Sequence, residues 1–147
     1  QVVNAIIASL EGMKGTKIEE ALNAETDAVT YFEAYRSRTS KEALIVNLNT
    51  LYNSYLGEYE GESGFGLDDY LIEVLDRPEI DTALQEAFVV AMNDLEAMDG
   101  AIEDILVSDV TALETLRTDL QTIIGLLKTD FSSAASIVVT FNDTDGD

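Results

Sequence analysis

The 147-residue sequence contains neither cysteine nor histidine. These two absences exclude a Ser-His-Asp triad, a cysteine nucleophile, an imidazole base and a zinc site with nitrogen or sulfur ligands from this chain. Catalysis or metal binding by its own residues must therefore use carboxylates, hydroxyls, amides, lysine or arginine. Oxygen ligands suit calcium or magnesium better than iron or zinc. We expect the chain alone to bind iron and zinc poorly and to have no peptidase activity.

Basic residues are also scarce, with 8 against 29 acidic residues and a formal net charge of −21. Such a charge repels nucleic-acid phosphates and anionic membrane surfaces, so we expect neither as a partner. It suits solubility in high salt or the capture of cations. No apolar run approaches the ~18 residues that a membrane-spanning helix needs. No signal peptide is visible.

Apolar residues at helical spacing are the main feature that is present. The length fits one domain, and 46% hydrophobic residues with one proline favour a folded chain. Long helices are predicted over 1–14 and 40–56 and as a pair covering 79–131, and a short helix over 67–75. We therefore predict an all-α fold, an antiparallel helical bundle with an extended C-terminal tail, forming a single domain over residues 1–147.

The segments between these helices are predicted to be irregular. Residues 16–30 are polar and mixed, with one helical turn over 18–22, and residues 57–66 form a glycine-rich connector. The tail, residues 132–147, is expected to be extended and to pack on the helices without forming a sheet. The first helix begins without an N-cap, which suggests that upstream chain was removed.

Within the pair covering 79–131, Pro78 suits the first turn of the first helix. Its apolar face runs from Ile80 to about Leu106, and Ser108 or Asp109 is expected to cap the second helix.

The start and end of the 40–56 helix carry recognisable signals. Thr39 and Glu42 fit a capping box, in which each side chain accepts a hydrogen bond from the other residue's backbone N–H. Gly57 is placed to end the helix in the left-handed conformation. We therefore expect a well-defined helix between these residues.

A group of cations precedes and begins this helix. Arg36, Arg38 and Lys41 are three of the eight basic residues. They either pair with nearby carboxylates or form a small anion-attracting spot beside the helix N-terminus. Glu33 lies near them, and Asn47 borders the apolar stripe of the helix, where a polar side chain needs a partner.

The acidic C-terminus contains Asp143, Asp145 and Asp147 around Gly146, which is part of a calcium-loop pattern. An EF-hand is excluded because its first position falls on Phe141 and the chain ends before the twelfth. A weaker surface cation site on the three aspartates remains open. Paired carboxylates can run acid–base chemistry, but among 29 acidic residues the sequence cannot select a pair.

Several motifs occur in a consistent order along the chain. They are Glu33-x-x-x-Ser37-x-x-Ser40, Asn47, Tyr55-Leu56-Gly57, Gly66-Leu67-x-Asp69-Tyr70-Leu71 and the closing Phe141-Asn142-Asp143-Thr144-Asp145-Gly146-Asp147. In this order they resemble the second half of the imelysin-like proteins, and the segment from Leu10 to Ile18 is similar to the part that precedes it. Two positions depart from the family pattern: Ala34 stands where serine is common, and Ala43 where aspartate is common.

The resemblance implies an all-α fold of two related helical bundles, of which this chain would be the C-terminal one. It also implies export to the periplasm, or anchoring at the cell surface as a lipoprotein, and a link to iron uptake with iron, haem or another divalent metal as ligand. The family's GxHxxE signature belongs to the first half and is absent here. The implied partner is the N-terminal half of the same protein or a second chain.

Carried over residue by residue, the implied site region is Glu33, Ser37, Ser40 and Asn47, to which the charge argument adds Arg36. We expect these residues to line a cleft against the missing half. Three functions remain open: a binding role in metal or haem acquisition, part of an M75-type metallopeptidase whose metal-binding half is missing, and a purely structural helical module that packs on a partner domain.

Overall fold

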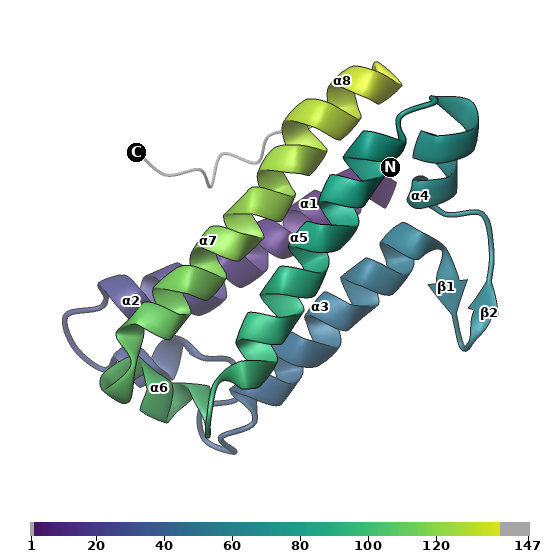
Figure 1. Cartoon of the computed structure of the whole chain (residues 1–147). Coiled ribbons are helices and arrows are strands. Elements are labelled where there is room, and N and C mark those ends of the chain that lie inside the picture. Colours follow the sequence, from purple (N-terminus) through teal and green to yellow (C-terminus); the bar gives the residue numbers. More distant parts are fainter. Residues whose placement is uncertain (1, 139–147) are drawn as a thin grey trace.

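The computed structural model describes residues 2–138, which form an antiparallel bundle of helices (Figure 1). The four long helices are α1 (Val2–Lys14), α3 (Ser40–Leu56), α5 (Pro78–Ala97) and α7 (Val110–Leu126). Both α1 and α5 pack on α3 and on α7, so the four helices close into a ring. Successive long helices run in opposite directions (Figure 1), as in an up-and-down bundle. The predicted all-α bundle is confirmed.

Shorter elements extend or connect the long helices. They are η1 (Gly15–Glu19), α2 (Glu20–Asn23), η2 (Ala28–Tyr31), β1 (Glu58–Tyr59), β2 (Glu62–Ser63), α4 (Leu67–Asp69), η3 (Tyr70–Val74), α6 (Ile102–Ser108), η4 (Leu127–Phe131) and α8 (Ser132–Ala135). Of these, η1, η3 and η4 are π-helical turns and η2 is a 3₁₀ turn.

The ring of long helices encloses one hydrophobic core. Each long helix contributes fully buried side chains from its predicted stripe, among them Leu10, Leu48, Phe88 and Leu120. Burying a side chain of this size stabilises the fold by about 1.5–3 kcal/mol. No helix within residues 2–138 is both long and apolar enough to cross a bilayer.

The first helix continues beyond its predicted end at Lys14. After it, η1 and α2 carry the helical backbone on to Asn23, where a mostly irregular segment was expected. The cause is tertiary packing, because Ile18 and Ala21 are buried in the same core as α1. The glycines before and within η1 do not end the helix.

The predicted long helix up to about Leu106 is instead divided in two. Its first part, α5, begins with Pro78 as predicted and ends at Ala97. Gly100 has a φ of 88°, a left-handed conformation that favours glycine. The chain turns there, so that α6 packs on α3 and α7. Both α5 and α6 keep the helical spacing of apolar residues. That spacing therefore could not show where the predicted helix is interrupted.

The last helix is capped by Asp109, whose Oδ1 accepts a 3.3 Å hydrogen bond from the N–H of Ala112. It continues through η4 and α8 to Ala135. The extended tail predicted to begin at Ser132 is therefore wrong for its first four residues. Residues 139–147 lie outside the part of the chain that the structure describes.

The glycine-rich connector after α3 contains a β-hairpin. In it, β1 pairs antiparallel with β2, with Glu58 opposite Ser63 and Tyr59 opposite Glu62. The sequence predicted a turn-rich connector here and did not predict the strand pairing. Gly57 ends α3 in the left-handed conformation as predicted, with a φ of 67°.

Candidate functional site

Two of the predicted site residues, Glu33 and Asn47, line the same surface hollow. The hollow has a volume of about 510 Å³, and Lys17, Ala34, Thr39, Glu42, Ala43 and Val46 complete its lining. Glu33 comes from the irregular segment before α3, and Asn47 from the middle of that helix. The fold thus brings together residues that the motif places fourteen positions apart, 47 minus 33.

The carboxylate of Glu33 is exposed and is held by one cation. The ammonium group of Lys17, in η1, lies 2.6 Å from Oε2 of Glu33. The hydrogen bond from Lys17, together with its positive charge, lowers the pKa of Glu33 below the ordinary value. Glu33 therefore remains charged at neutral pH, with Oε2 engaged by Lys17.

Ser40 lies beneath this hollow and is buried. Its hydroxyl donates a 2.6 Å hydrogen bond to Oε1 of Glu103 and accepts a 3.2 Å bond from the N–H of Ala34. It also lines a cavity of about 10 Å³ together with Lys17 and Glu33. Ser40 therefore ties the loop that carries Glu33 to helix α6.

The predicted capping box at the start of α3 does not form. The Thr39 side chain makes no capping bond. Its hydroxyl is instead 2.8 Å from that of Ser37, which also donates a 3.0 Å bond to the carbonyl of Ala34. Glu42 is exposed at the edge of the hollow. The loop before α3 places the hydroxyl of Ser37 closer to Thr39 than the backbone N–H of Glu42 is, and the capping-box pattern does not specify the geometry of that loop.

The three clustered cations separate in the structure. Arg38 forms an ion pair with Asp104. Lys41 donates to the carbonyls of Glu96 and Met98, where a positive charge suits the C-terminal end of α5. The carboxylate-pairing interpretation thus holds for Arg38, and the anion-attracting spot loses two of its three cations.

Arg36 and Ser37 lie outside the hollow. Arg36 is exposed, and its Nε donates a 3.0 Å hydrogen bond to the hydroxyl of Tyr35. Ser37 is occupied within its own loop. Of the five predicted site residues, the structure therefore places Glu33 and Asn47 together and Ser40 beneath them. Arg36 and Ser37 lie apart from these three.

A second hollow adjoins the first between α1 and α3. It measures about 520 Å³ and is lined by Ser9, Gly12, Met13, Thr16, Lys17, Asn47, Thr50 and Leu51. Lys17 and Asn47 line both hollows. We call the two together the α1–α3 groove. Gly12 has open space beside it.

Sequence reasoning missed Lys17 and Glu103. Lys17 lies in a segment expected to be mostly irregular, sixteen residues before its partner Glu33, 33 minus 17. Glu103 is one of 29 acidic residues, and nothing in its neighbourhood along the chain marks it as buried. Their roles depend on packing between distant segments, which neither spacing nor charge count reveals.

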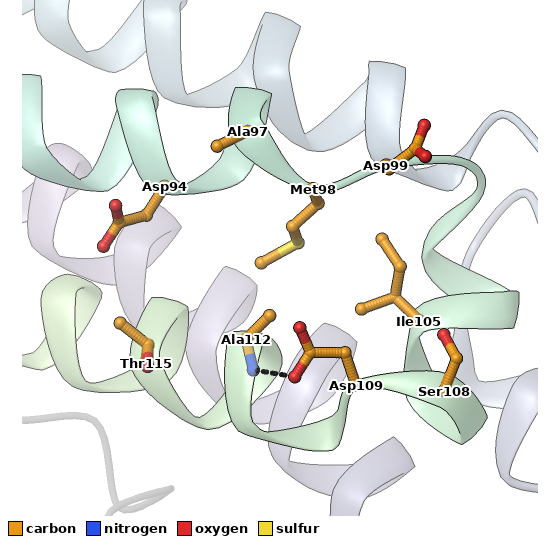
Figure 2. A pocket seen from close by; sticks show the side chains of 9 residues that line it. All are labelled: Asp94, Ala97, Met98, Asp99, Ile105, Ser108, Asp109, Ala112 and Thr115. Atoms are coloured by element: carbon orange, nitrogen blue, oxygen red, sulfur yellow. Dashed lines mark hydrogen bonds between the residues drawn. The ribbon is translucent and has the colours of Figure 1, made fainter.

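A further hollow lies between the C-terminal end of α5, helix α6 and the start of α7 (Figure 2). Its volume is about 570 Å³, and it is lined by Asp94, Ala97, Met98, Asp99, Ile105, Ser108, Asp109, Ala112 and Thr115. Asp109 is already used as a helix cap. Within residues 2–138, no group of three or more acidic, histidine or cysteine side chains is arranged to hold a metal ion. The three aspartates 143, 145 and 147 fall outside the described residues.

One carboxylate pair, which the sequence could not select, stands out between α5 and α7. Burial, together with the charge and hydrogen bonding of Asp94, raises the pKa of Asp119 to about 6. Both side chains are only partly accessible. Asp94 also lines the hollow between α5, α6 and α7, whereas neither residue belongs to the α1–α3 groove.

Comparison with known proteins agrees with the motifs in the sequence. The model of the family described as Peptidase_M75: Imelysin matches residues 1–129. No curated protein and no solved structure matches the chain. Because the family model covers most of its length, the chain belongs to the imelysin family.

Proposed function

We propose that this chain is the C-terminal helical bundle of an exported imelysin-like protein with a binding role in the acquisition of iron, haem or another metal. Its binding face is the α1–α3 groove. The N-terminal half of the same protein, or a second chain, covers this groove and supplies the remaining ligands. The observation that carries the proposal is that Glu33 and Asn47 line one hollow.

The polar groups of the groove suit a shared site. Glu33 keeps a negative charge at neutral pH because Lys17 lowers its pKa. Lys17 engages Oε2, which leaves Oε1 to face a ligand, and Asn47 adds an amide. These are hard oxygen donors. They do not make a complete metal site, since the described residues contain no group of three or more suitable side chains.

The apolar and small residues of the groove suit a packed partner. Val46 is 63% exposed, and Gly12, Ala34 and Ala43 allow a neighbouring helix to approach closely. A purely structural module would use the same surface. The two proposals differ in whether Glu33 and Asn47 contribute to ligand binding or only to packing.

Family membership favours an exported protein, and we propose the periplasm or the cell surface as its location. The peptidase alternative requires a metal-binding half from outside these residues. Nothing in the groove assembles a nucleophile and a base, so we derive no catalytic step.

The test is calorimetric titration of the complete gene product with ferric citrate, hemin and zinc chloride, each in turn. We expect at least one of these to saturate a site, and Glu33→Gln to weaken that binding by about tenfold. Glu25→Gln is the matched control, because Glu25 is an exposed acid away from the groove. Equal affinities of the two variants for every probe would assign Glu33 a structural role only.

A further inference from the structure

The hairpin after α3 forms an exposed surface that the groove does not use. We call it the hairpin surface, meaning residues 57–70 with Val2 and Ser54. It lies at the end of the bundle away from α6 (Figure 1). Both residues of β1 and both of β2 are exposed. The hairpin therefore contributes nothing to the hydrophobic core.

The hairpin nevertheless has a well-defined shape. The N–H of Gly64 donates a 2.9 Å bond to the carbonyl of Gly57, which closes its base. Glu60 and Gly61, at the turn, have φ values of 50° and 83°; positive φ at both central residues matches the twist of paired strands. At Gly66, a Cβ would lie 2.5 Å from the carbonyl carbon of Leu56. The chain thus maintains a specific, closely packed base for a loop that buries no apolar side chain.

Large apolar side chains gather on this surface. Tyr59 is 75% exposed and Phe65 is 64% exposed. Beside Phe65 lies a hollow of about 280 Å³ that is otherwise lined by Val2, Ser54, Gly66, Leu67 and Tyr70. Exposed aromatic residues beside an apolar hollow are typical of sites that anchor a partner's side chain.

The charge around this hollow selects the kind of partner. Residues 58–79 contain one basic residue, Arg77, and eight acidic ones: Glu58, Glu60, Glu62, Asp68, Asp69, Glu73, Asp76 and Glu79. Nucleic acid and anionic lipid would be repelled. A second copy would also be repelled, because each copy has a formal charge of −21.

From these observations we infer that the hairpin surface binds a basic protein segment. The segment's lysine or arginine side chains face the carboxylates of the hairpin. One of its apolar side chains enters the hollow beside Phe65. The complementary charge speeds the encounter and sets the specificity, while the apolar anchor supplies affinity.

The test uses the complete gene product and a fluorescent helical peptide with one leucine face and one lysine face. We expect Phe65→Ser to weaken peptide binding by about tenfold. Val107→Ser is its control, since Val107 is 84% exposed on α6 at the other end of the bundle. The triple variant Glu58→Gln, Glu60→Gln, Glu62→Gln should weaken binding more than Glu25→Gln, Glu96→Gln, Glu114→Gln, which removes three exposed acids from the far end.

A photo-reactive residue in place of Tyr59 or of Val107 gives an independent readout that does not depend on these variants. Cross-links to the peptide at position 59 but not at 107 support the inference. Three results would overturn it: equal losses in each matched pair, no peptide binding, or cross-links from position 59 to another part of the same polypeptide.

Discussion

The hydroxyl of Ser40 donates a 2.6 Å hydrogen bond to Oε1 of Glu103, and both side chains are buried. Ser40 begins α3, and Glu103 lies in the first turn of α6. The second oxygen of Glu103 has no hydrogen-bond partner within the described residues. The Glu103 carboxylate therefore depends on Ser40, and this bond fixes the loop that carries Glu33.

Replacing Ser40 tests this dependence. Ser40→Ala leaves a buried carboxylate without its donor, and we expect it to lower the free energy of unfolding by about 1–3 kcal/mol. Ser54→Ala is the control on the same helix, because the Ser54 hydroxyl bonds only to the Thr50 carbonyl at an exposed position. Urea unfolding measures both. Equal stability of the two variants would show that the Ser40–Glu103 bond is unimportant.

Removing the cation beside Glu33 should change the titration of that residue. In Lys17→Met, the pKa of Glu33 should return upward toward its ordinary value, as followed by carbon NMR of its carboxyl group. A lowered pKa stabilises the fold above the ordinary pKa, and this stabilisation is lost as the pH falls through the lowered one.

Because Glu33 is exposed and screened by solvent, we expect the stability change in Lys17→Met to stay below about 0.5 kcal/mol. Lys14→Met is the control, since Lys14 pairs with Glu19 instead. If the pKa of Glu33 is the same in both variants, Lys17 does not hold this carboxylate in solution.

The raised pKa of Asp119 predicts a pH-dependent stability. Its folded-state pKa of about 6 lies above the ordinary value. At pH values between the ordinary pKa and about 6, the folded state therefore binds more protons than the unfolded state. The stabilisation is complete below the ordinary pKa and is lost as the pH rises through about 6. Asp119→Asn should therefore be more stable than the parent at pH 8 by roughly 1–3 kcal/mol.

Urea unfolding at pH 5 and pH 8 checks this expectation. The difference between Asp119→Asn and the parent should be smaller at pH 5. Glu114→Gln, an exposed acid on the same helix, removes the same formal charge without the buried pair and should show little such change. A parent protein that matches Asp119→Asn at both pH values would contradict the raised pKa.

The sequence was sufficient for the bundle because the fold follows from local patterns. The apolar periods of α1, α3, α5 and α7 lie within single segments. Helix ends are marked by the restricted backbone of Pro78, the capping side chain of Asp109 and the left-handed conformation of Gly57. The breaks between these elements were less predictable. The left-handed turn at Gly100 leaves the apolar period intact on both sides, and Ile18 continues a helix only because distant residues bury it.

Part of the candidate site could also be predicted, because it too follows from local patterns in the sequence. The motif located Glu33 and Asn47, which lie in neighbouring segments, and the structure brings them to one hollow. Lys17 and Glu103 contact this region from other elements, and no short-range pattern records such contacts. The capping box failed because Thr39 had a closer hydroxyl partner in the loop.

The contrast between Asn47→Ala and Leu48→Ala in the complete gene product tests the binding role of the α1–α3 groove most directly. Asn47 lines the groove, whereas the adjacent Leu48 is fully buried in the core. We expect Asn47→Ala to weaken binding of the saturating probe by about tenfold with little change in melting temperature. Leu48→Ala should cost roughly 2–5 kcal/mol of stability, while the molecules that remain folded keep their affinity. The opposite outcome for Asn47→Ala, unchanged affinity with a lowered melting temperature, would make Asn47 structural and contradict the proposed site.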